Sequence, residues 1–275
     1  MRVGITQEEA TLLQASITTS YVRYPGLQGE VRAYVAHPDG AGPWPALIVI
    51  HEWTGLIPYV EDVARRLARE GYLALAPDLY TDDPIRESLT PEDLEGATDV
   101  GNAPDVEVAI QALRPERQDS VRRAHQWRRA RTGATHVPDL QATMAYAQGR
   151  ADIAPNAIGI IGFCMGGRLA GTLATTGAAL AAAVVFYGPI PPLEGVPNVR
   201  CPVEGHYGEK DHVVKLPTLA KLDEAMTAAG KQFTYYVYEG APHGFHNDTW
   251  ADYAPAAAEL AWDRSLQFLD RHVKG

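Results

Sequence analysis

The sequence predicts an α/β protein with a mostly parallel central sheet flanked by helices. Two features of the chain support this fold class. From about residue 45 onward, short and almost continuously apolar segments alternate with segments of helical periodicity, as expected for strands that are buried on both faces. The chain has 275 residues, of which 46% are hydrophobic and 21% charged, as in ordinary globular proteins. We therefore expect residues 1–275 to form a single domain with one large core.

The expected strands and helices follow in a regular order. The segments SYVRY and VRAYVAHP alternate between apolar and polar side chains and predict an antiparallel edge. Six buried strands are expected after them, at about 46–52, 72–80, 157–163, 181–188, 201–208 and 233–240. The helices expected between and after these strands include one that buries Val60, Val63, Ala64 and Leu67 and ends at Gly71, one at 216–229, and one at about 254–272.

Residues 81–136 interrupt this order, because they contain no strand pattern. The segment carries nine acidic residues between Asp82 and Glu107 and seven arginines between Arg114 and Arg131. An insertion of this length between two core strands predicts a helical excursion rather than a linker. The arginines are candidates for a patch that binds a substrate anion. Charged helix faces are usually exposed, however, which favours an exposed helix paired with the preceding acidic stretch.

Charge and cysteine content exclude several classes of partner. The formal net charge of −10 would repel phosphates, so no nucleic-acid partner is expected. The first residues, MRVGITQEEATLLQ, do not resemble a signal peptide, and no segment approaches the roughly 20 apolar residues of a membrane span. The only cysteines, Cys164 and Cys201, fit a reducing compartment. We expect a cytoplasmic protein without a membrane partner, and the sequence leaves its oligomeric state open.

The segment IGIIGFCMGGRLAG at 158–171 predicts a nucleophile elbow, which is a sharp strand-to-helix turn. Gly162 and Gly166 lie two residues before and two residues after Cys164, where the backbone has to pass closely. The elbow presents its central side chain above the carboxyl ends of the strands and at a helix N-terminus, which favours a thiolate. We therefore interpret Cys164 as a nucleophile rather than as a buried cysteine in a glycine-rich turn.

An acid and a histidine follow the elbow in the chain order that such a site requires. Asp211 lies just past the expected strand at 201–208, and His243 lies in the glycine-bracketed loop after the next strand. His243 would accept the proton of the thiol, and Asp211 would fix the tautomer of the imidazole.

Other titratable residues compete for these roles. His246 is close to His243, but the turn Pro242–His243–Gly244 suits a loop tip better. Asp78 precedes the nucleophile in the chain and is expected to cap a loop. Three further residues are expected to be solvated loop residues: His206, Glu209 and His212.

The oxyanion of an acyl-transfer reaction needs backbone donors. One is expected from Met165, directly after the nucleophile, and the other from Trp53, in the loop after the strand at 46–52. This chemistry requires no organic cofactor. Since no HExxH or CxxC spacing occurs, no metal is expected either.

Five motifs stand out in order along the chain: HEWTGL (51–56), GYLALAPDLY (71–80), GFCMGGR (162–168), GEKDHVV (208–214) and HGF (243–245). Together they resemble the motifs of the dienelactone hydrolases, the carboxymethylenebutenolidase family of the α/β-hydrolase superfamily. The resemblance covers roughly residues 20–272, and the cysteine elbow followed by two glycines is its most specific part. It implies an α/β-hydrolase fold and hydrolysis of a lactone or ester through an acyl-enzyme, with the family's Cys-His-Asp triad mapped onto Cys164, His243 and Asp211.

The resemblance adds Glu52 to the site, because the family has a glutamate beside the cysteine after the third strand. An ionised carboxylate next to a thiol disfavours the thiolate by like-charge repulsion. We therefore hypothesise that Glu52 keeps Cys164 protonated, and less open to oxidation, until substrate displaces Glu52 or changes its hydrogen bonding.

The chain departs from the family at the arginines that bind the dienelactone carboxylate. The segment after the histidine reads HGFHND and has no arginine, and Arg86 is the candidate in the segment after PDLY. His246 and the arginines at 114–131 are candidates to replace the missing one. We expect hydrolysis of a small carboxylic ester or lactone, dienelactone-like. The alternatives are a general small-ester or thioester hydrolase and a thiol redox or binding protein in which Cys201 pairs with Cys164.

Overall fold

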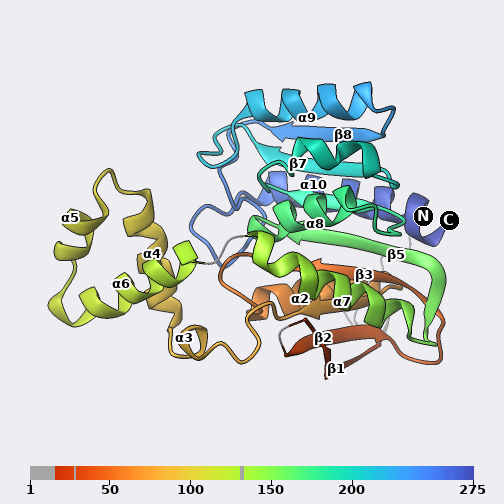
Figure 1. Cartoon of the computed structure of the whole chain (residues 1–275), viewed down its shortest axis with the longest axis horizontal. Helices are drawn as coiled ribbons and strands as arrows, with labels where there is room; N and C mark the ends of the chain where they lie inside the picture. Colours follow the sequence, from red (N-terminus) through yellow and green to blue (C-terminus); the bar gives the residue numbers. More distant parts are fainter. Residues whose placement is uncertain (1–15, 28, 131–132) are drawn as a thin grey trace, which may run out of the picture. The chain divides into compact units, whose positions relative to one another are not determined.

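An eight-stranded sheet forms the centre of the fold in the computed structural model, which describes residues 16–27, 29–130 and 133–275. The strand order is β1-β2-β4-β3-β5-β6-β7-β8 (Figure 1). β2 pairs antiparallel with β1 and with β4, and the neighbours from β4 to β8 pair in parallel. The predicted antiparallel edge and mostly parallel sheet are confirmed. The strands are β1 (Ile17–Pro25), β2 (Glu30–Pro38), β3 (Trp44–Ile50), β4 (Leu73–Pro77), β5 (Ile153–Phe163), β6 (Ala183–Phe186), β7 (Val203–Gly208) and β8 (Phe233–Tyr238).

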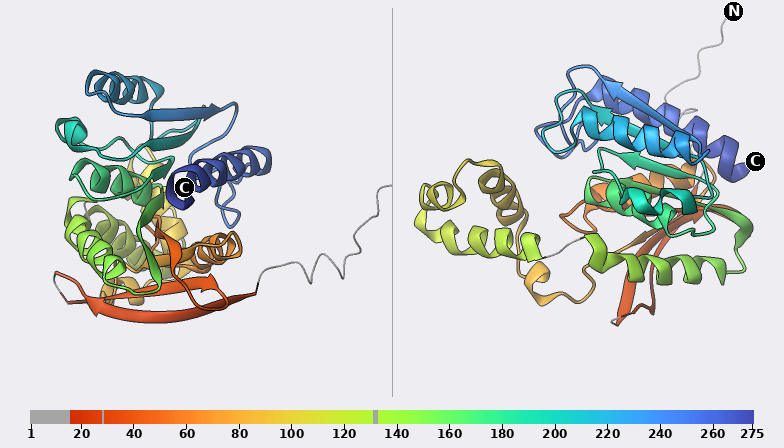
Figure 2. Two further views of the ribbon diagram at one scale, coloured as in Figure 1. Left: turned by 90° about the vertical axis from the view of Figure 1, so that its right-hand side faces the viewer. Right: turned by 45° about the horizontal axis from the view of Figure 1, so that its top comes forward.

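Helices cover both faces of the sheet (Figure 2). One face packs against α7 (Val137–Gln148), α8 (Met165–Thr175) and α9 (Leu216–Ala228). The other face packs against α2 (Pro58–Arg69) and α10 (Pro255–Leu269). A 3-10 turn, η2 (Leu193–Asn198), lies between β6 and β7, and a π-helical turn, η3 (Asp270–Lys274), follows α10.

The packing of α2 illustrates how the apolar pattern fixes these layers. Its helical start is set by Pro58 at the first turn, and its buried face includes Val60, Val63 and Leu67, as the periodicity predicted. Fully burying one such side chain stabilises the fold by about 1.5–3 kcal/mol. The helix therefore docks through this face and leaves its charged residues at the surface.

The parallel strands direct their carboxyl ends to one edge of the sheet. Glu52 follows β3, Cys164 follows β5, Asp211 follows β7 and His243 follows β8. This edge therefore gathers residues that are far apart in the sequence, in the place where open α/β sheets bind ligands.

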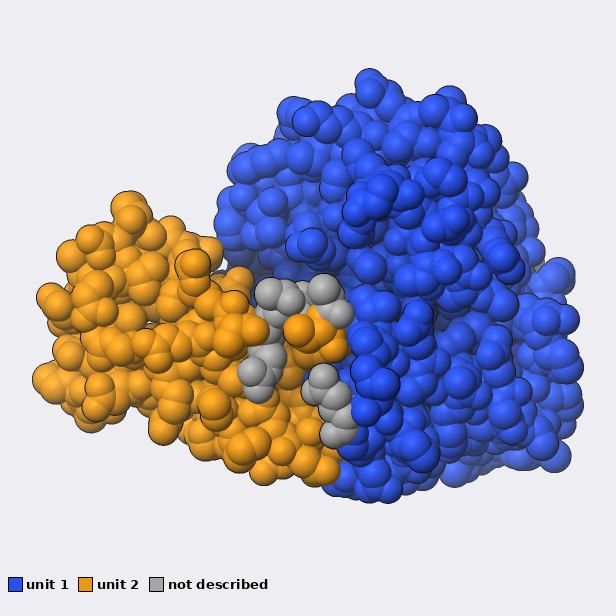
Figure 3. Space-filling model, in the orientation of Figure 1, with its two compact units in different colours: residues 1–79, 137–275 blue, residues 80–136 orange. Residues whose placement is uncertain are grey.

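Residues 80–136 form a compact unit of their own, distinct from the unit of residues 1–79 and 137–275 (Figure 3). The predicted helical insertion is confirmed, and its small core includes Val100, Ile110 and Val121. Its elements are α3 (Pro84–Glu87), α4 (Pro91–Asn102), α5 (Val106–Gln111), α6 (Pro115–Ala130) and the 3-10 turn η1 (Gly133–His136).

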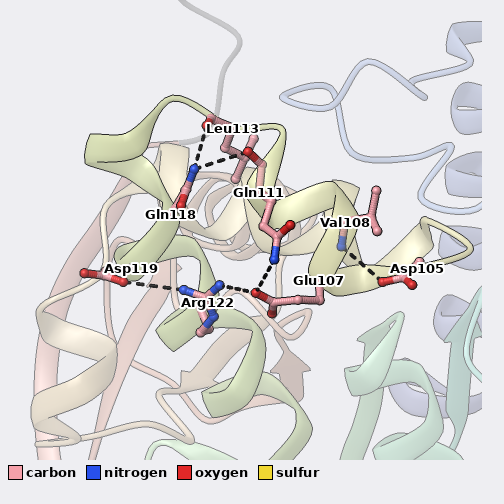
Figure 4. Close-up of polar contacts among 8 residues, drawn as sticks. All are labelled: Asp105, Glu107, Val108, Gln111, Leu113, Gln118, Asp119 and Arg122. Atoms are coloured by element: carbon pink, nitrogen blue, oxygen red, sulfur yellow. Dashed lines mark hydrogen bonds and ion pairs between the residues drawn. The ribbon is translucent and has the colours of Figure 1, made fainter.

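The arginines of α6 pair in part with acidic residues of the same unit. Arg122 lies 2.6 Å from the Glu107 carboxylate on α5 and 3.4 Å from Asp119 (Figure 4). These contacts agree with an exposed helix paired with the preceding acidic stretch. Arg86 lies in α3 and donates to the carbonyl oxygen of Leu89. Arg131 and the N-terminal residues 1–14, which also entered our predictions, lie outside the described residues.

Two kinds of feature are absent from residues 16–27, 29–130 and 133–275. None of the helices in these ranges combines the length and the apolar character needed to cross a lipid bilayer. The same residues contain no cluster of three or more His, Cys, Asp or Glu side chains with a geometry that could hold a metal ion.

Candidate active site

Cys164 lies at a sharp turn between β5 and α8. Its backbone has φ 52° and ψ −113°, a conformation that residues with side chains adopt rarely. The turn is held by the Cys164 amide, which donates to the Phe186 carbonyl oxygen at 3.0 Å. Strained backbone of this kind persists only where the surrounding structure enforces it.

Glycines enforce the turn because no side chain fits beside it. A Cβ atom added to Gly162 would lie 2.1 Å from the carbonyl oxygen of Gly166. One added to Gly166 would lie 2.3 Å from the carbonyl oxygen of Ile50. Both distances are far below van der Waals contact, so the spacing of glycines around Cys164 has the steric cause that the elbow interpretation assumed.

His243 bridges Cys164 and Asp211. Its Nε2 lies 3.1 Å from the Cys164 sulfur, and its Nδ1 lies 2.9 Å from Oδ2 of Asp211. The other Asp211 oxygen accepts hydrogen bonds from the backbone amides of Val213 and Val214, at 2.7 and 2.8 Å. Asp211 is thereby oriented by its own loop, and it in turn orients the imidazole of His243.

The electrostatics of the three groups favour charge separation. Burial of the His243 ring opposes its charged form, but the adjacent Cys164 sulfur and Asp211 carboxylate outweigh this and raise the pKa of His243 to about 10. Burial also raises the pKa of Asp211, but the hydrogen bond from His243 and the two backbone amides more than offset it, so the net shift is downward. The site can therefore hold the His243 imidazolium beside the Asp211 carboxylate, in contact with the Cys164 sulfur.

Glu52 is fully buried directly after β3. Its Oε2 accepts from Nδ2 of Asn247 at 2.6 Å, and its Oε1 accepts from the hydroxyl of Tyr187 at 3.1 Å. Burial raises the pKa of Glu52 to about 7, although Asn247, His243 and Tyr187 favour the ionised form. The carboxyl that we expected to be ionised is therefore poised to gain or lose its proton near neutrality.

Replacing Glu52 by glutamine is expected to change how stability depends on pH. A carboxyl whose pKa is higher in the folded chain stabilises the fold fully below its unfolded value of 4.5, and that stabilisation is lost as the pH rises through about 7. The parent should therefore lose about 2.5 kcal/mol from this group between pH 5 and pH 8. Glutamine has no such dependence.

Urea unfolding of the parent and of Glu52→Gln at both pH values measures this effect. Relative to the parent, the free energy of unfolding of Glu52→Gln should be about 2.5 kcal/mol more favourable to the folded state at pH 8 than at pH 5. A difference that stays constant with pH would show that the buried carboxyl does not titrate in this range.

The two residues expected to supply oxyanion donors lie beside Cys164 and Glu52 in the chain. Met165 opens α8 directly after Cys164. Trp53 is buried in the turn after β3, in which the Gly55 amide donates to the Glu52 carbonyl oxygen at 3.1 Å. Their amides thus belong to the loops that also carry the candidate nucleophile and Glu52.

The expectation that His206 is a solvated loop residue is wrong. It is fully buried in β7, and it contacts the Tyr238 hydroxyl at 2.8 Å, the Ser265 hydroxyl at 2.9 Å and Glu204 at 3.1 Å. Burial lowers its pKa, so the ring is neutral at physiological pH. His206 lies within β7 (Val203–Gly208), inside the strand expected at 201–208, and its ring faces the interior rather than a loop.

The positions of the other competing residues do not allow any of them to take the role of His243 or Asp211. Glu209 and His212 are exposed, as expected. Asp78 pairs with Arg32 at 2.9 Å. His246 is buried, and its Nδ1 contacts the Tyr59 hydroxyl at 2.6 Å.

His246 also fails as a replacement for a substrate-binding arginine. Burial, with the positive charge of Arg66, lowers the pKa of His246 to about 3. The ring is therefore neutral near pH 7 and cannot supply a cation. A buried loop position that packs among aromatic rings explains this outcome.

Two residues that contact Glu52 were missed at the level of sequence. Tyr187 follows the apolar segment AVVF and looked like part of a buried strand; its φ of 39° and its hydroxyl contact are visible only in three dimensions. Asn247 lies in HGFHND, four residues after His243, but no spacing rule connects it to a residue after β3. The asparagine and glutamate are 195 residues apart in the chain.

Comparison with known proteins places these features in a family. A model of the dienelactone hydrolase family matches residues 31–273. A protein of Saccharolobus solfataricus that is named as a carboxymethylenebutenolidase is 33% identical over 263 residues, which cover 89% of this chain and 95% of that protein. A protein of Bradyrhizobium sp. that is named as a 2-oxo-3-(5-oxofuran-2-ylidene)propanoate lactonase is 30% identical over 262 residues, covering 91% and 93%.

A crystal structure from Klebsiella pneumoniae, described as that of a dienelactone hydrolase, superimposes with a TM-score of 0.72. The two sequences are 28% identical, and the alignment covers 93% of this chain and 99% of that one. The expected α/β-hydrolase fold is confirmed.

Proposed function

Because the chain belongs to the dienelactone hydrolase family of carboxylic ester hydrolases, we propose that it hydrolyses a small ester or lactone through an acyl-enzyme formed on Cys164. The observation that carries this proposal is the position of His243, whose two ring nitrogens contact the Cys164 sulfur and the Asp211 carboxylate at 3.1 and 2.9 Å. A base between a nucleophile and an orienting acid is the arrangement that activates a thiol.

In the first half of the reaction the Cys164 sulfur attacks the acyl carbon of the substrate. The thiol proton passes to Nε2 of His243, and a carbon–sulfur bond forms while the carbonyl oxygen becomes an oxyanion. The backbone amides of Met165 and Trp53 are proposed to donate to that oxyanion. When the tetrahedral adduct collapses, the ester carbon–oxygen bond breaks and His243 protonates the departing alkoxide.

In the second half a water molecule attacks the thioester. His243 takes one proton from the water, and the hydroxide adds to the acyl carbon. Collapse breaks the carbon–sulfur bond, the carboxylic acid leaves, and the sulfur recovers its proton from His243. Asp211 holds Nδ1 of the imidazole in both halves, so that Nε2 always faces the reacting atoms.

Glu52 is proposed to gate the formation of the thiolate. An ionised carboxyl in this buried site repels a sulfur anion, whereas a protonated one does not. Its pKa of about 7 supports a role in which the charge of Glu52 changes within the working pH range. Substrate that alters the hydrogen bonds from Tyr187 or Asn247 would then alter the state of Cys164.

The substrate is proposed to be a small lactone that resembles dienelactone. The names of the relatives in Saccharolobus and Bradyrhizobium, a carboxymethylenebutenolidase and a furanylidene-propanoate lactonase, support a lactone rather than an open-chain ester. A general small-ester or thioester hydrolase is the second candidate, because the segment HGFHND offers no arginine for a substrate carboxylate.

Parallel assays of cis-dienelactone, p-nitrophenyl acetate and an acetyl thioester distinguish these candidates. We expect kcat/KM to be higher for the lactone than for the neutral ester and the thioester. A preference for either neutral substrate would retain the acyl-enzyme chemistry and reject the dienelactone assignment.

A redox role through a Cys164–Cys201 disulfide receives no support from the positions of the two thiols. Cys201 belongs to the core cluster on one face of the sheet, whereas Cys164 packs against the cluster on the other face. Burial also raises the pKa of Cys201 to about 11, which keeps it a thiol. The proposed chemistry needs a reduced Cys164, which is consistent with a cytoplasmic location.

A further inference from the structure

Asn247 connects the loop that carries His243 to the carboxyl group of Glu52. The side chain is fully buried, and its Nδ2 donates to Oε2 of Glu52 at 2.6 Å. Its Oδ1 accepts two hydrogen bonds from Thr249, from the backbone amide at 3.0 Å and from the hydroxyl at 2.6 Å. Since both donors occupy the oxygen end of the amide, the NH₂ end must face Glu52.

The backbone of the same loop holds Asn247 in place. Its amide donates to the Gly244 carbonyl oxygen at 2.9 Å, and its own carbonyl oxygen accepts from the Trp250 amide at 3.1 Å. Gly244, with φ +77°, supplies the turn directly after His243. The asparagine is therefore fixed relative to the candidate catalytic histidine.

The second oxygen of Glu52 is held by a similarly constrained group. The Tyr187 hydroxyl donates to Oε1 at 3.1 Å, and the tyrosine ring forms a T-shaped contact with the His243 ring, with centroids 5.2 Å apart. Each Glu52 oxygen thus accepts from one neutral donor. Hydrogen bonds donated to both oxygens favour the ionised form of a carboxyl over the protonated one.

We propose that Asn247 is a positioning residue that holds Glu52 beside His243 and favours its ionised form, and thereby sets the pH range in which the reactivity of Cys164 responds to Glu52. This role of Asn247 rests on the proposed function, because it adds a second residue to the gating role of Glu52. An amide is suited to this task because its NH₂ group donates at every pH and carries no charge of its own.

The groups around Glu52 leave few sites that change charge near neutrality. Tyr187 follows β6, and Tyr59, on α2, interacts with Tyr187 and with His246. Burial holds the pKa of both tyrosines well above its ordinary value and lowers that of His246 to about 3.

The more distant charges of Arg66 and Asp248 act on the pKa of Tyr59. His243 acts on Glu52 directly and contacts Cys164 and Asp211. A change in the charge of Glu52 therefore acts on the pair formed by His243 and Cys164.

The pH dependence of Cys164 alkylation by iodoacetamide tests the proposal without any turnover. The parent should show an inflection near pH 7 that disappears in Glu52→Gln. Asn247→Ala removes the amide, and Asn247→Leu removes its donor while keeping most of the side-chain volume and adding no titratable group. Both changes should move the inflection to higher pH by about one unit or more, because the ionised Glu52 loses a charge-assisted hydrogen bond. In a Glu52→Gln background, neither Asn247 change should move the profile.

Ser265→Ala is the matched control for the loss of a buried polar side chain. Ser265 is fully buried on α10 and contacts His206, and its removal should leave the inflection at the parent's pH. If Asn247→Ala does not fold, Asn247→Leu keeps most of the volume of the side chain and carries the test.

The proposal would be overturned by a parent profile without an inflection near pH 7, by an unchanged inflection in the Asn247 variants, or by an equal shift in the Glu52→Gln background. A failure of the proposed function itself would appear elsewhere, as ester hydrolysis that persists when Cys164 is fully alkylated.

Discussion

Replacing Cys164 by alanine is expected to lower kcat/KM for ester and lactone hydrolysis by a factor on the order of 10⁴ or more. Alanine removes the atom to which the acyl group is attached and leaves His243 without the sulfur that it contacts at 3.1 Å. What remains is binding and oxyanion stabilisation, which support only weak catalysis of attack by water. Initial rates with p-nitrophenyl acetate and cis-dienelactone measure the loss.

Cys201→Ala is the matched control for this prediction. Cys201 is the other free cysteine of the chain, and it lies in the core cluster on the opposite face of the sheet from the one that Cys164 contacts. Its replacement should leave kcat/KM close to that of the parent. If both variants lost activity equally, loss of the fold rather than loss of the nucleophile would explain the result for Cys164→Ala.

Replacing Gly162 by alanine should disrupt the elbow and destabilise the protein by at least about 3 kcal/mol. The new Cβ would lie 2.1 Å from the carbonyl oxygen of Gly166 and 2.8 Å from the amide nitrogen of Gly167. These are backbone atoms in the first turn of α8, so no side-chain rotation relieves the clash. Activity should fall as well, because Cys164 would no longer be held 3.1 Å from His243. Urea unfolding and ester hydrolysis measure the two effects.

Gly171→Ala provides the comparison on the same helix. Its Cβ would meet Pro191 at 3.4 Å, which is ordinary van der Waals contact, and alanine has the higher helix propensity by about 1 kcal/mol. This variant should be at least as stable as the parent. Equal stability of the Gly162 and Gly171 variants would contradict the steric account of the elbow.

The sheet and the elbow were predictable because both follow from local sequence. Apolar segments of strand length, separated by helical periodicity, placed the strands from β3 to β8 within a few residues. The elbow was visible because glycines at fixed spacing around Cys164 answer a steric need within a single turn. Chain order then pointed to His243, which contacts Cys164 in the structure, and to Asp211, which contacts His243.

The surroundings of Glu52 could not be predicted in the same way. Its partners, Tyr187 and Asn247, follow β6 and β8, and only the tertiary fold brings them to the end of β3. The raised pKa of Glu52 likewise depends on complete burial, which no sequence motif reports. His206 was misassigned for a related reason: it lies within the strand expected at 201–208, but no sequence motif shows that its ring faces the interior.

The identity of the residue that carries the acyl group during turnover decides whether Cys164 is the nucleophile. We would mix the protein with excess p-nitrophenyl acetate, quench with acid within the first turnover, and locate the acetyl group by peptide mass spectrometry. If Cys164 is the nucleophile, we expect a burst of p-nitrophenolate equal to the enzyme concentration, one acetyl group on Cys164, and neither signal in Cys164→Ala. An acetyl group on a different side chain, or hydrolysis by Cys164→Ala at the rate of the parent, would contradict this role of Cys164.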